Sequence, residues 1–333
     1  MSESRSLRSP VVALLLTLLL VPFVAGCGSD GGPNVPDQTE IRRLEAYNPD
    51  LNSWETLAPM PTARSTAAAV AIGTKIYVVG GKDSRRGVGS MRTLEIYDPA
   101  TNSWSSGANM PTARWGPAAV AFNDEMWVMG GALTADTFYD VVEIYNPATD
   151  TWRTGESMDV ARYRPAVGVV DGRIYVAGGM STGGTDIDDF EIWDPQFSSW
   201  LTTDVMPVAR GQAAYGVYGD TLYVAGGFRW VSAAQKTTLD RTDSYADGPR
   251  WMTGLAAMPL ARAETASGMI GSKLYVVGGI TETTGITYHN RLDIYDVLTD
   301  SWTSGAPSDT IRAEAAAAVF SGRLYVVGGY NGG

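Results

Sequence analysis

The sequence contains almost no cysteine or histidine. Its 333 residues include one cysteine, Cys27, and one histidine, His289. A single cysteine forms no internal disulfide, and one cysteine with one histidine cannot supply the four ligands of a structural zinc site. We therefore expect no metal site, and nothing else in the sequence predicts a cofactor.

The sequence also lacks an excess of basic charge. Lysine and arginine number 25 against 36 aspartates and glutamates, which gives a formal net charge of −11. Such a chain is repelled by the phosphates of nucleic acids and by anionic bilayers. Nucleic acid is not an expected partner, and a membrane would hold the chain only through an attached lipid.

The apolar run near the N-terminus is too short for a membrane-spanning helix. It covers residues 11–24 and follows Arg5 and Arg8, whereas a transmembrane helix needs about 20 apolar residues. A basic start, a short apolar run and small residues at the end are typical of an export signal. The signal ends in VAGC at residues 24–27, which resembles the lipobox of prokaryotic lipoproteins.

The lipobox resemblance implies that residues 1–26 are a signal peptide and that Cys27 carries lipid. Residues 27–40 are rich in Gly, Pro and Asp, which predicts a flexible tether. The protein would then be exported and anchored to the membrane, facing the periplasm or the cell exterior. An ordinary secretory signal that happens to end in cysteine is the alternative.

The rest of the chain repeats with a period of about fifty residues. Three features recur in register, which is the signature of a repeat architecture. Gly-Gly pairs begin at Gly80, Gly130, Gly178, Gly226, Gly278 and Gly328. Tryptophans recur at Trp54, Trp104, Trp152, Trp200, Trp251 and Trp302, and arginines at Arg64, Arg114, Arg162, Arg210, Arg262 and Arg312. Each arginine precedes its Gly-Gly pair by 16 residues, and each tryptophan precedes its arginine by 10 residues except in the fifth copy, where the spacing is 11.

One repeat predicts four short antiparallel strands. In the first complete copy, residues 67–72 and 75–80 are apolar and β-branched and are joined by a Gly-Thr turn. Residues 93–99 predict a third strand that ends at Asp-Pro, and residues 103–107 a fourth around Trp104. A single four-stranded sheet cannot bury both faces, so six must stack around an axis.

This pattern closely resembles the kelch repeat, which implies an all-β, six-bladed kelch-type β-propeller over residues 41–333. The chain starts with a lone third and fourth strand, LEAYNPDLNSWETLAP, and ends with a lone first and second strand, AAAAVFSGRLYVVGGY. We therefore expect the N- and C-terminal strands to complete one blade together. A monomer is expected.

The resemblance places the loops before each first strand and after each Gly-Gly pair around the mouth of a central channel. The loops after Gly-Gly vary in length, whereas the segments between arginine and Gly-Gly do not, which points to the loop face as the binding surface. The six arginines form either a positive collar that binds a ligand or a framework that holds loop carbonyls and carboxylates of neighbouring blades. Both interpretations stay open.

Positions that differ among the repeats are more informative about a ligand. Two residues after the arginines stand Thr66, Gly116, Arg164, Gln212, Glu264 and Glu314. We expect them to line the channel asymmetrically. Glu264 and Glu314 occupy equivalent positions in adjacent blades, so with Arg164 they are candidate catalytic residues, because paired carboxylates suit acid and base work. Solvated channel glutamates are the alternative.

Aromatic residues near the mouth are further candidates for ligand contact. The residues expected to stack on a sugar or anchor a peptide are Trp115, Tyr163, Phe228, Trp230 and Tyr330, with packing inside the fold as the alternative for each. Trp230, in the longest loop, is expected to be the most exposed. The acidic run from Asp186 to Glu191 lacks EF-hand spacing and is interpreted as a solvated loop.

The sequence therefore favours a lipid-anchored binding module, without catalysis, for a glycan or protein ligand on the loop face. A carbohydrate-active kelch enzyme resembling sialic-acid mutarotase is the alternative, with a channel lined by Arg and Glu that opens the ring of an acidic sugar. A purely structural module in an envelope assembly is a third possibility.

Overall fold

The computed structural model describes residues 40–84, 87–232, 235–246, 250–283 and 285–332. The chain divides into a unit of residues 1–35 and a unit of residues 36–333, and the second contains everything described below. The predicted signal peptide, Cys27 and most of the tether lie outside the described residues. Within those residues, no helix is long and apolar enough to cross a bilayer.

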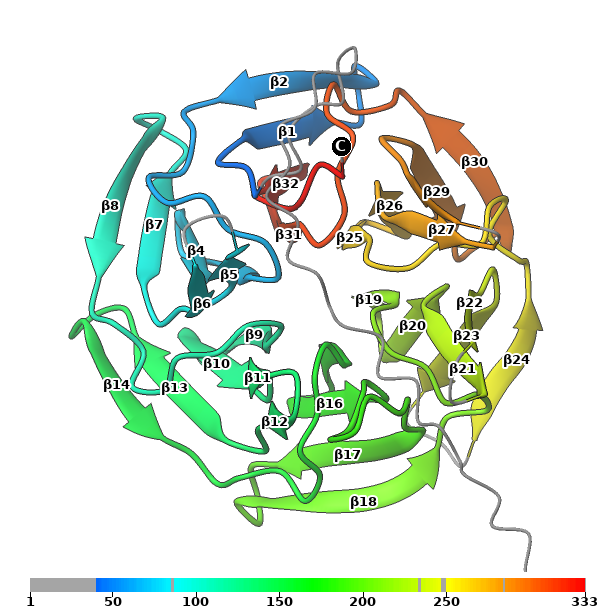
Figure 1. Cartoon of the computed structure of the whole chain (residues 1–333), viewed down its shortest axis with the longest axis horizontal. Helices are drawn as coiled ribbons and strands as arrows, with labels where there is room; N and C mark the ends of the chain where they lie inside the picture. The colour runs from blue at the N-terminus through cyan, green and yellow to red at the C-terminus, as the bar shows by residue number, and fades with distance from the viewer. Residues whose placement is uncertain (1–39, 85–86, 233–234, 247–249, 284, 333) are drawn as a thin grey trace, which may run out of the picture. The chain divides into compact units, whose positions relative to one another are not determined.

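Six four-stranded antiparallel sheets surround a central axis (Figure 1). Blade I contains β3 (Ala68–Ile72), β4 (Lys75–Val79), β7 (Leu94–Asp98) and β8 (Ser103–Gly107). Blade II contains β9 (Ala118–Phe122), β10 (Glu125–Met129), β13 (Val142–Asn146) and β14 (Thr151–Thr154). Blade III contains β15 (Ala166–Val170), β16 (Arg173–Ala177), β17 (Asp189–Asp194) and β18 (Ser199–Val205). Blade IV contains β19 (Ala214–Tyr218), β20 (Thr221–Ala225), β23 (Thr242–Ala246) and β24 (Trp251–Leu255).

The remaining two blades include the one that closes the ring. Blade V contains β25 (Ala266–Ile270), β26 (Lys273–Val277), β29 (Leu292–Asp296) and β30 (Ser301–Gly305). Blade VI joins the two ends of the chain in the order β2 (Ser53–Leu57), β1 (Leu44–Asn48), β32 (Arg323–Val327), β31 (Ala316–Phe320). The predicted all-β, six-bladed propeller with a shared terminal blade is thus confirmed, and the strands predicted in the first copy agree with β3, β4, β7 and β8 to within one residue at each end.

The innermost strands are built from small side chains. Each first strand lies beside the first strand of the next blade, and β31 lies beside β3, so the circle is closed. Alanines of these strands line a narrow passage along the axis, among them Ala69, Ala119 and Ala316. Larger side chains would fill this passage, since the six strands converge there.

The paired glycines allow neighbouring repeats to touch. Gly80 has a φ of +71°, and a Cβ at this position would lie 2.7 Å from the carbonyl oxygen of Arg114 in the next repeat. The N–H of Gly81 donates to that same oxygen at 3.0 Å. Any side chain at residue 80 would therefore push the two repeats apart.

The recurrent tryptophans also join blades. In five copies the indole N–H donates to a backbone carbonyl that follows the fourth strand of the preceding blade, as Trp104 does to Ala58 at 2.8 Å. The indole nitrogen of Trp251 has no such partner among the described residues. This is the copy in which the spacing to the arginine is 11 residues instead of 10.

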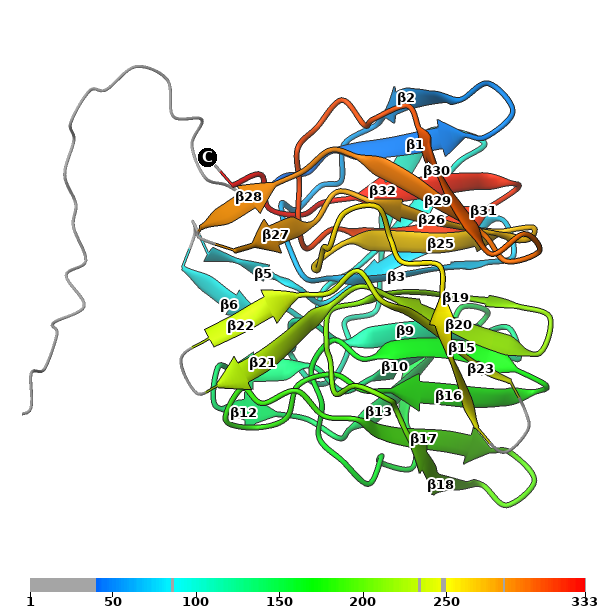
Figure 2. The same cartoon turned by 90° about the vertical axis from the view of Figure 1, so that its right-hand side faces the viewer.

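Four of the variable loops form hairpins that the sequence did not predict. They are β5 (Lys82–Asp83) with β6 (Val88–Ser90), β11 (Ala132–Thr134) with β12 (Thr137–Phe138), β21 (Phe228–Ser232) with β22 (Gln235–Thr238), and β27 (Ile280–Glu282) with β28 (Ile286–Tyr288). Figure 2 shows that all four extend from the same face of the propeller. They form a rim around the mouth of the channel.

Candidate functional site

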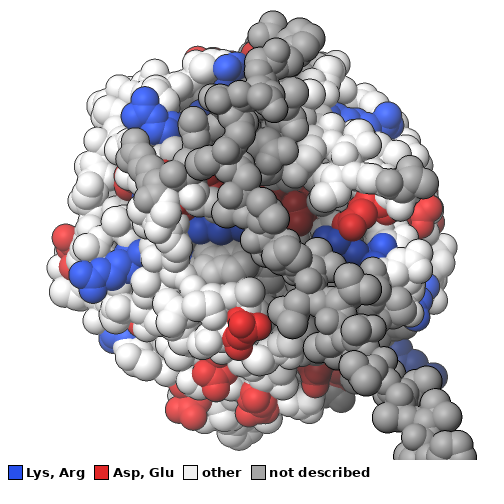
Figure 3. Space-filling view, viewed as in Figure 1, with Lys and Arg blue, Asp and Glu red and all other residues white. Residues whose placement is uncertain are grey.

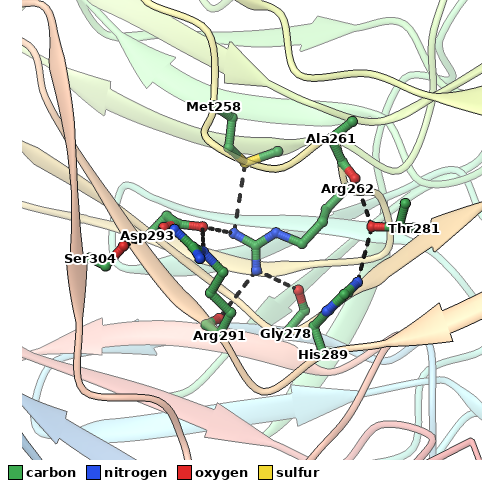
Figure 4. Close-up of polar contacts among 9 residues, drawn as sticks. All are labelled: Met258, Ala261, Arg262, Gly278, Thr281, His289, Arg291, Asp293 and Ser304. Atoms are coloured by element: carbon green, nitrogen blue, oxygen red, sulfur yellow. Dashed lines mark hydrogen bonds and ion pairs between the residues drawn. The ribbon is translucent and has the colours of Figure 1, made fainter.

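The six recurrent arginines are buried inside the blades. Their side chains are at most 1% exposed. Arg64 shows the shared arrangement, in which Nη1 donates to the carbonyls of Gly80 and Thr93 at 3.0 and 3.1 Å and Nη2 pairs with Glu95 at 2.9 Å. Figure 4 shows the corresponding contacts of Arg262, which pairs with Asp293 at 2.5 Å. Buried guanidinium groups need such partners, because an unpaired buried charge is costly.

Every arginine has a carboxylate partner at one repeat position. The partners of the six arginines are Glu95, Glu143, Glu191, Asp243, Asp293 and Glu45, in the order Arg64 to Arg312. The framework interpretation therefore describes these arginines, and the predicted collar of ligand-binding guanidinium groups is corrected, since none of them reaches the surface. Glu191, interpreted from the sequence as part of a solvated loop, is the fully buried partner of Arg162.

The residues two positions after the arginines form a closed ring around the axis. The backbone N–H of each residue donates to the carbonyl of its counterpart in the preceding repeat, as Gly116 does to Thr66 at 2.7 Å. Thr66 in turn donates to Glu314 of the last repeat at 2.8 Å, which closes the ring. All six have a positive φ between +49° and +61°. We call Thr66, Gly116, Arg164, Gln212, Glu264 and Glu314 the channel ring. The expectation that these positions surround the channel is confirmed.

The channel ring gathers the three predicted catalytic candidates. Arg164 approaches Glu314 with an N–O distance of 3.7 Å and donates to Gln212 at 3.3 Å. Glu264 is the ring neighbour of Glu314, and their backbones are hydrogen-bonded at 2.9 Å. Burial and the charge of Glu314 raise the pKa of Glu264 to about 7, although Arg164 acts in the opposite direction. Glu264 therefore exchanges a proton near neutral pH.

A hollow of about 310 Å³ lies at the mouth beside Glu264 and Glu314. It is lined by residues of four blades and of the segment entering β1: Glu40, Lys82, Ser84, Lys236, Glu264, Ile280, Ile286, Tyr288, Glu314 and Tyr330. Figure 3 shows basic and acidic atoms close together near the centre of this face. Beside the channel ring, the first part of the alanine-lined passage measures about 70 Å³, and a further cavity of about 250 Å³ lies between the same innermost strands.

Family comparisons agree with this architecture. The KLHDC2/KLHL20/DRC7 kelch-repeats domain matches residues 29–227, more than half of the chain, and the kelch motif matches residues 261–308. The chain belongs to the kelch-repeat family.

Solved structures show the same propeller fold. The structure of YjhT superposes on this kelch propeller with a TM-score of 0.70 and 16% sequence identity, over 83% of this chain and 94% of that one. At this identity the similarity concerns the fold alone. No protein with a curated description matches the chain.

The predicted aromatic contacts lie at different depths in the kelch propeller, from Phe228, which is 1% exposed, to Tyr330, which lines the hollow. Tyr163 is only 5% exposed, and its ring packs against Trp115 with ring centroids 4.8 Å apart. A Cβ on Gly116 would lie 1.8 Å from that ring, so glycine at this ring position makes room for Tyr163. Trp230 is half-buried rather than prominently exposed. Its loop packs on Asp186, whose carboxylate accepts a hydrogen bond from the backbone N–H of Trp230 at 2.7 Å.

The sequence reasoning missed two groups of residues, one at the mouth and one inside the blades. Lys82 and Lys236 lie in the loop hairpins over the rings of Trp115 and Phe228, at 4.5 and 4.1 Å from the ring centroids. Lys236 lies in a loop of variable length, which the repeat pattern does not describe. Lys82 directly follows a Gly-Gly pair and is the only charged residue at that repeat position. The carboxylate partners of the arginines were detectable, because an acidic residue stands two positions before the third-strand aromatic in every copy.

Proposed function

We propose that this kelch propeller is a binding module that takes a glycan or protein ligand at the mouth of its channel. The observation that carries the proposal is the meeting of Arg164, Glu264 and Glu314 in the channel ring, contributed by blades III, V and VI. The two glutamates line the hollow at the mouth, and Arg164 lines the passage beside it. Side chains that differ between repeats and converge on one cavity serve a ligand, because the blades themselves need only what all copies share.

The chemistry of the mouth favours a small polar ligand or a short polar segment of a larger one. A hollow of about 310 Å³ is at the lower end of the range for small-molecule sites. It offers charges of both signs and the two aromatic side chains Tyr288 and Tyr330. Sugars are bound by this combination of ring stacking and hydrogen bonds to charged groups.

A glycan array probed with the purified full-length protein tests the proposal. Binding to a defined set of glycans is expected, and Arg164→Ala and Glu314→Gln should each weaken it about tenfold or more. The exposed Arg153 offers a matched control, because Arg153→Ala removes the same charge outside the channel. Ligand binding that survives both channel substitutions would place the site elsewhere on the loop face.

A second candidate function is catalysis: the protein would open the ring of an acidic sugar, and would thus resemble sialic-acid mutarotase. The observation that favours it is the unequal pair of carboxyl groups: Glu314 lies 3.7 Å from both Arg164 and Lys82, whereas the pKa of Glu264 is raised to about 7 by burial and by Glu314. Two carboxyls in such different environments suit an acid and a base.

In this reaction one carboxylate takes the proton of the anomeric hydroxyl while the ring C–O bond breaks and the ring oxygen receives a proton from the other carboxyl. Rotation of the open form and the reverse transfers give the other anomer. Nuclear magnetic resonance of anomer exchange in acidic sugars measures the reaction. An exchange rate equal to that in buffer alone, for all sugars that bind, would exclude the enzyme and leave the binding module.

We further propose that Cys27 anchors the propeller to a membrane through lipid. The support is the lipobox-like end of the apolar run and the position of the only cysteine. Cys27→Ser should move the protein from the membrane fraction to the soluble fraction, because stable anchoring depends on the attached chains. Retention of the variant in the membrane fraction would contradict the anchor without affecting the proposal for the mouth.

A further inference from the structure

We propose that the ligand of the mouth carries an ammonium group, which lies between Glu40 and Glu264 against the rings of Tyr288 and Tyr330. The inference rests on the proposed function, because the same hollow holds the ligand. It adds the chemical class of the ligand group that contacts the hollow. The argument follows from which charges in the hollow already have partners.

The positive charges at the mouth are paired. Lys82 lies 3.7 Å from Glu314, and Arg164 approaches the same carboxylate at 3.7 Å. Lys236 pairs with Glu282 at 3.0 Å. Both lysines also lie over aromatic rings. An anionic ligand would therefore have to break existing ion pairs to bind these groups.

Two carboxyl groups of the hollow have no ion pair in the described part of the chain. Glu40 is 4% exposed, and its Oε1 accepts a hydrogen bond from the N–H of Ser84 at 3.0 Å. Its other oxygen, Oε2, is buried and without a hydrogen-bond partner among the described residues. A buried carboxylate oxygen left without a donor is costly, so it marks a place where a donor from outside is stabilised.

Glu264 shows the same shortage of positive charge. No lysine or arginine among the described residues lies within ion-pair distance of its carboxyl group, and burial together with Glu314 raises its pKa to about 7. A cation entering the hollow would favour the ionised form of Glu264. A cation binds most strongly where the carboxyl groups of the site have no positive partner within the protein.

The cation that suits this site is an ammonium group rather than a metal ion. Among the described residues, no three acidic, histidine or cysteine side chains are arranged to hold a metal. The rings of Tyr288 and Tyr330 both line the hollow, with centroids 5.9 Å apart. Ammonium groups are attracted to aromatic faces and donate three hydrogen bonds. An amino sugar and a lysine side chain both present this group at a size that the hollow admits.

Calorimetric titration of the full-length protein tests the inference with three probes: glucosamine, its N-acetyl derivative, and Nα-acetyl-lysine methylamide. We expect at least one of the two amines to bind about tenfold or more tightly than N-acetylglucosamine, which has the same sugar ring without the charge. Tighter binding of glucosamine would assign the ammonium to a sugar, and tighter binding of the lysine derivative would assign it to a protein side chain.

Two substitutions locate the group. Glu40→Gln and Glu264→Gln should each weaken binding of the preferred amine about tenfold, because each removes one charge while keeping the size of the side chain. The exposed Glu156 provides the control, since Glu156→Gln removes a charge that does not line the hollow. Equal binding of amine and N-acetyl probes, or full affinity in both hollow variants, would overturn the inference. A glycan that binds without an amine and depends on Arg164 would overturn it too, while leaving the proposed binding function intact.

Discussion

The six buried arginines and the channel ring differ, although they lie only two residues apart in every repeat. The arginines are the same residue in all copies, are buried to the same degree and pair with a carboxylate of the third strand. The channel ring shares one backbone conformation and one set of hydrogen bonds but holds five different residue types. The repeat therefore fixes the backbone at both positions and leaves only the side chains of the ring free to serve a ligand.

The largest effect is expected from removing a framework arginine. Arg64→Ala leaves Glu95 buried without its ion-pair partner, and Arg114→Ala does the same to Glu143. Breaking a buried ion pair typically costs about 3–5 kcal/mol. Urea denaturation should show similar losses for the two variants, because their surroundings are equivalent.

The exposed Arg153 is the control for this measurement, since its loss should change the free energy of unfolding by less than about 0.5 kcal/mol. If either framework variant lost less than about 1 kcal/mol of unfolding free energy, the recurrent arginines would not contribute equally to stability.

The sequence predicted the framework well because the framework repeats. Spacing gave the blades, their four strands and the shared terminal blade, since each depends on contacts that recur six times. Spacing left open what the arginines do, because burial depends on how neighbouring blades pack. The same limit applies to Tyr163, whose ring is covered by Trp115 across a blade boundary.

The sequence predicted only those site residues that occupy an equivalent position in every repeat. Arg164, Glu264 and Glu314 were found because they depart from their counterparts at one repeat position. Lys236 lies in a loop whose length varies between repeats, and Glu40 precedes the first repeated strand, so only the folded chain brings them to the mouth. Lys82 follows its Gly-Gly pair directly and could have been found, because it is the only charged residue at that repeat position.

The second prediction concerns the acidity of the channel ring. The pKa of Glu264 is raised from 4.5 to about 7, first by burial and then by Glu314, against Arg164, Lys236 and Lys82. Between these two values the folded protein binds more protons than the unfolded chain, so this group favours the folded state below pH 4.5 and its contribution is lost as the pH rises through 7. The loss amounts to about 3 kcal/mol at most.

Glu264→Gln removes this dependence. The free energy of unfolding of the variant minus that of the wild type should therefore increase from pH 5 to pH 8, whereas the corresponding difference for Glu156→Gln should stay flat. A flat difference for Glu264→Gln would show that its carboxyl group has an ordinary pKa, and its role in the site would then be geometric.

The third prediction separates binding from stability. Arg164→Ala and Glu314→Gln should lower affinity for a ligand found on the array by about tenfold or more, or roughly 1.4–3 kcal/mol, because each removes a charged hydrogen-bonding group from the channel ring. Their melting temperatures should change little, since neither side chain takes part in the buried ion pairs of the framework. A large fall in melting temperature would place these residues with the framework instead.

The smallest effect, and the sharpest comparison, comes from replacing arginine by lysine at the two positions. Arg64 uses two guanidinium nitrogens to reach two carbonyls and a carboxylate, and lysine keeps the charge but loses the planar fork that reaches them together. Arg64→Lys should therefore cost about 1–2 kcal/mol of unfolding free energy, which corresponds to one or two net hydrogen bonds.

Arg164 approaches Glu314 only at 3.7 Å from one side of the channel, an approach that a lysine can reproduce. Arg164→Lys should change stability by less than about 0.5 kcal/mol. Equal costs at the two positions, measured by urea denaturation, would mean that the channel ring also depends on guanidinium geometry and that the distinction between framework and site is weaker than the structure indicates.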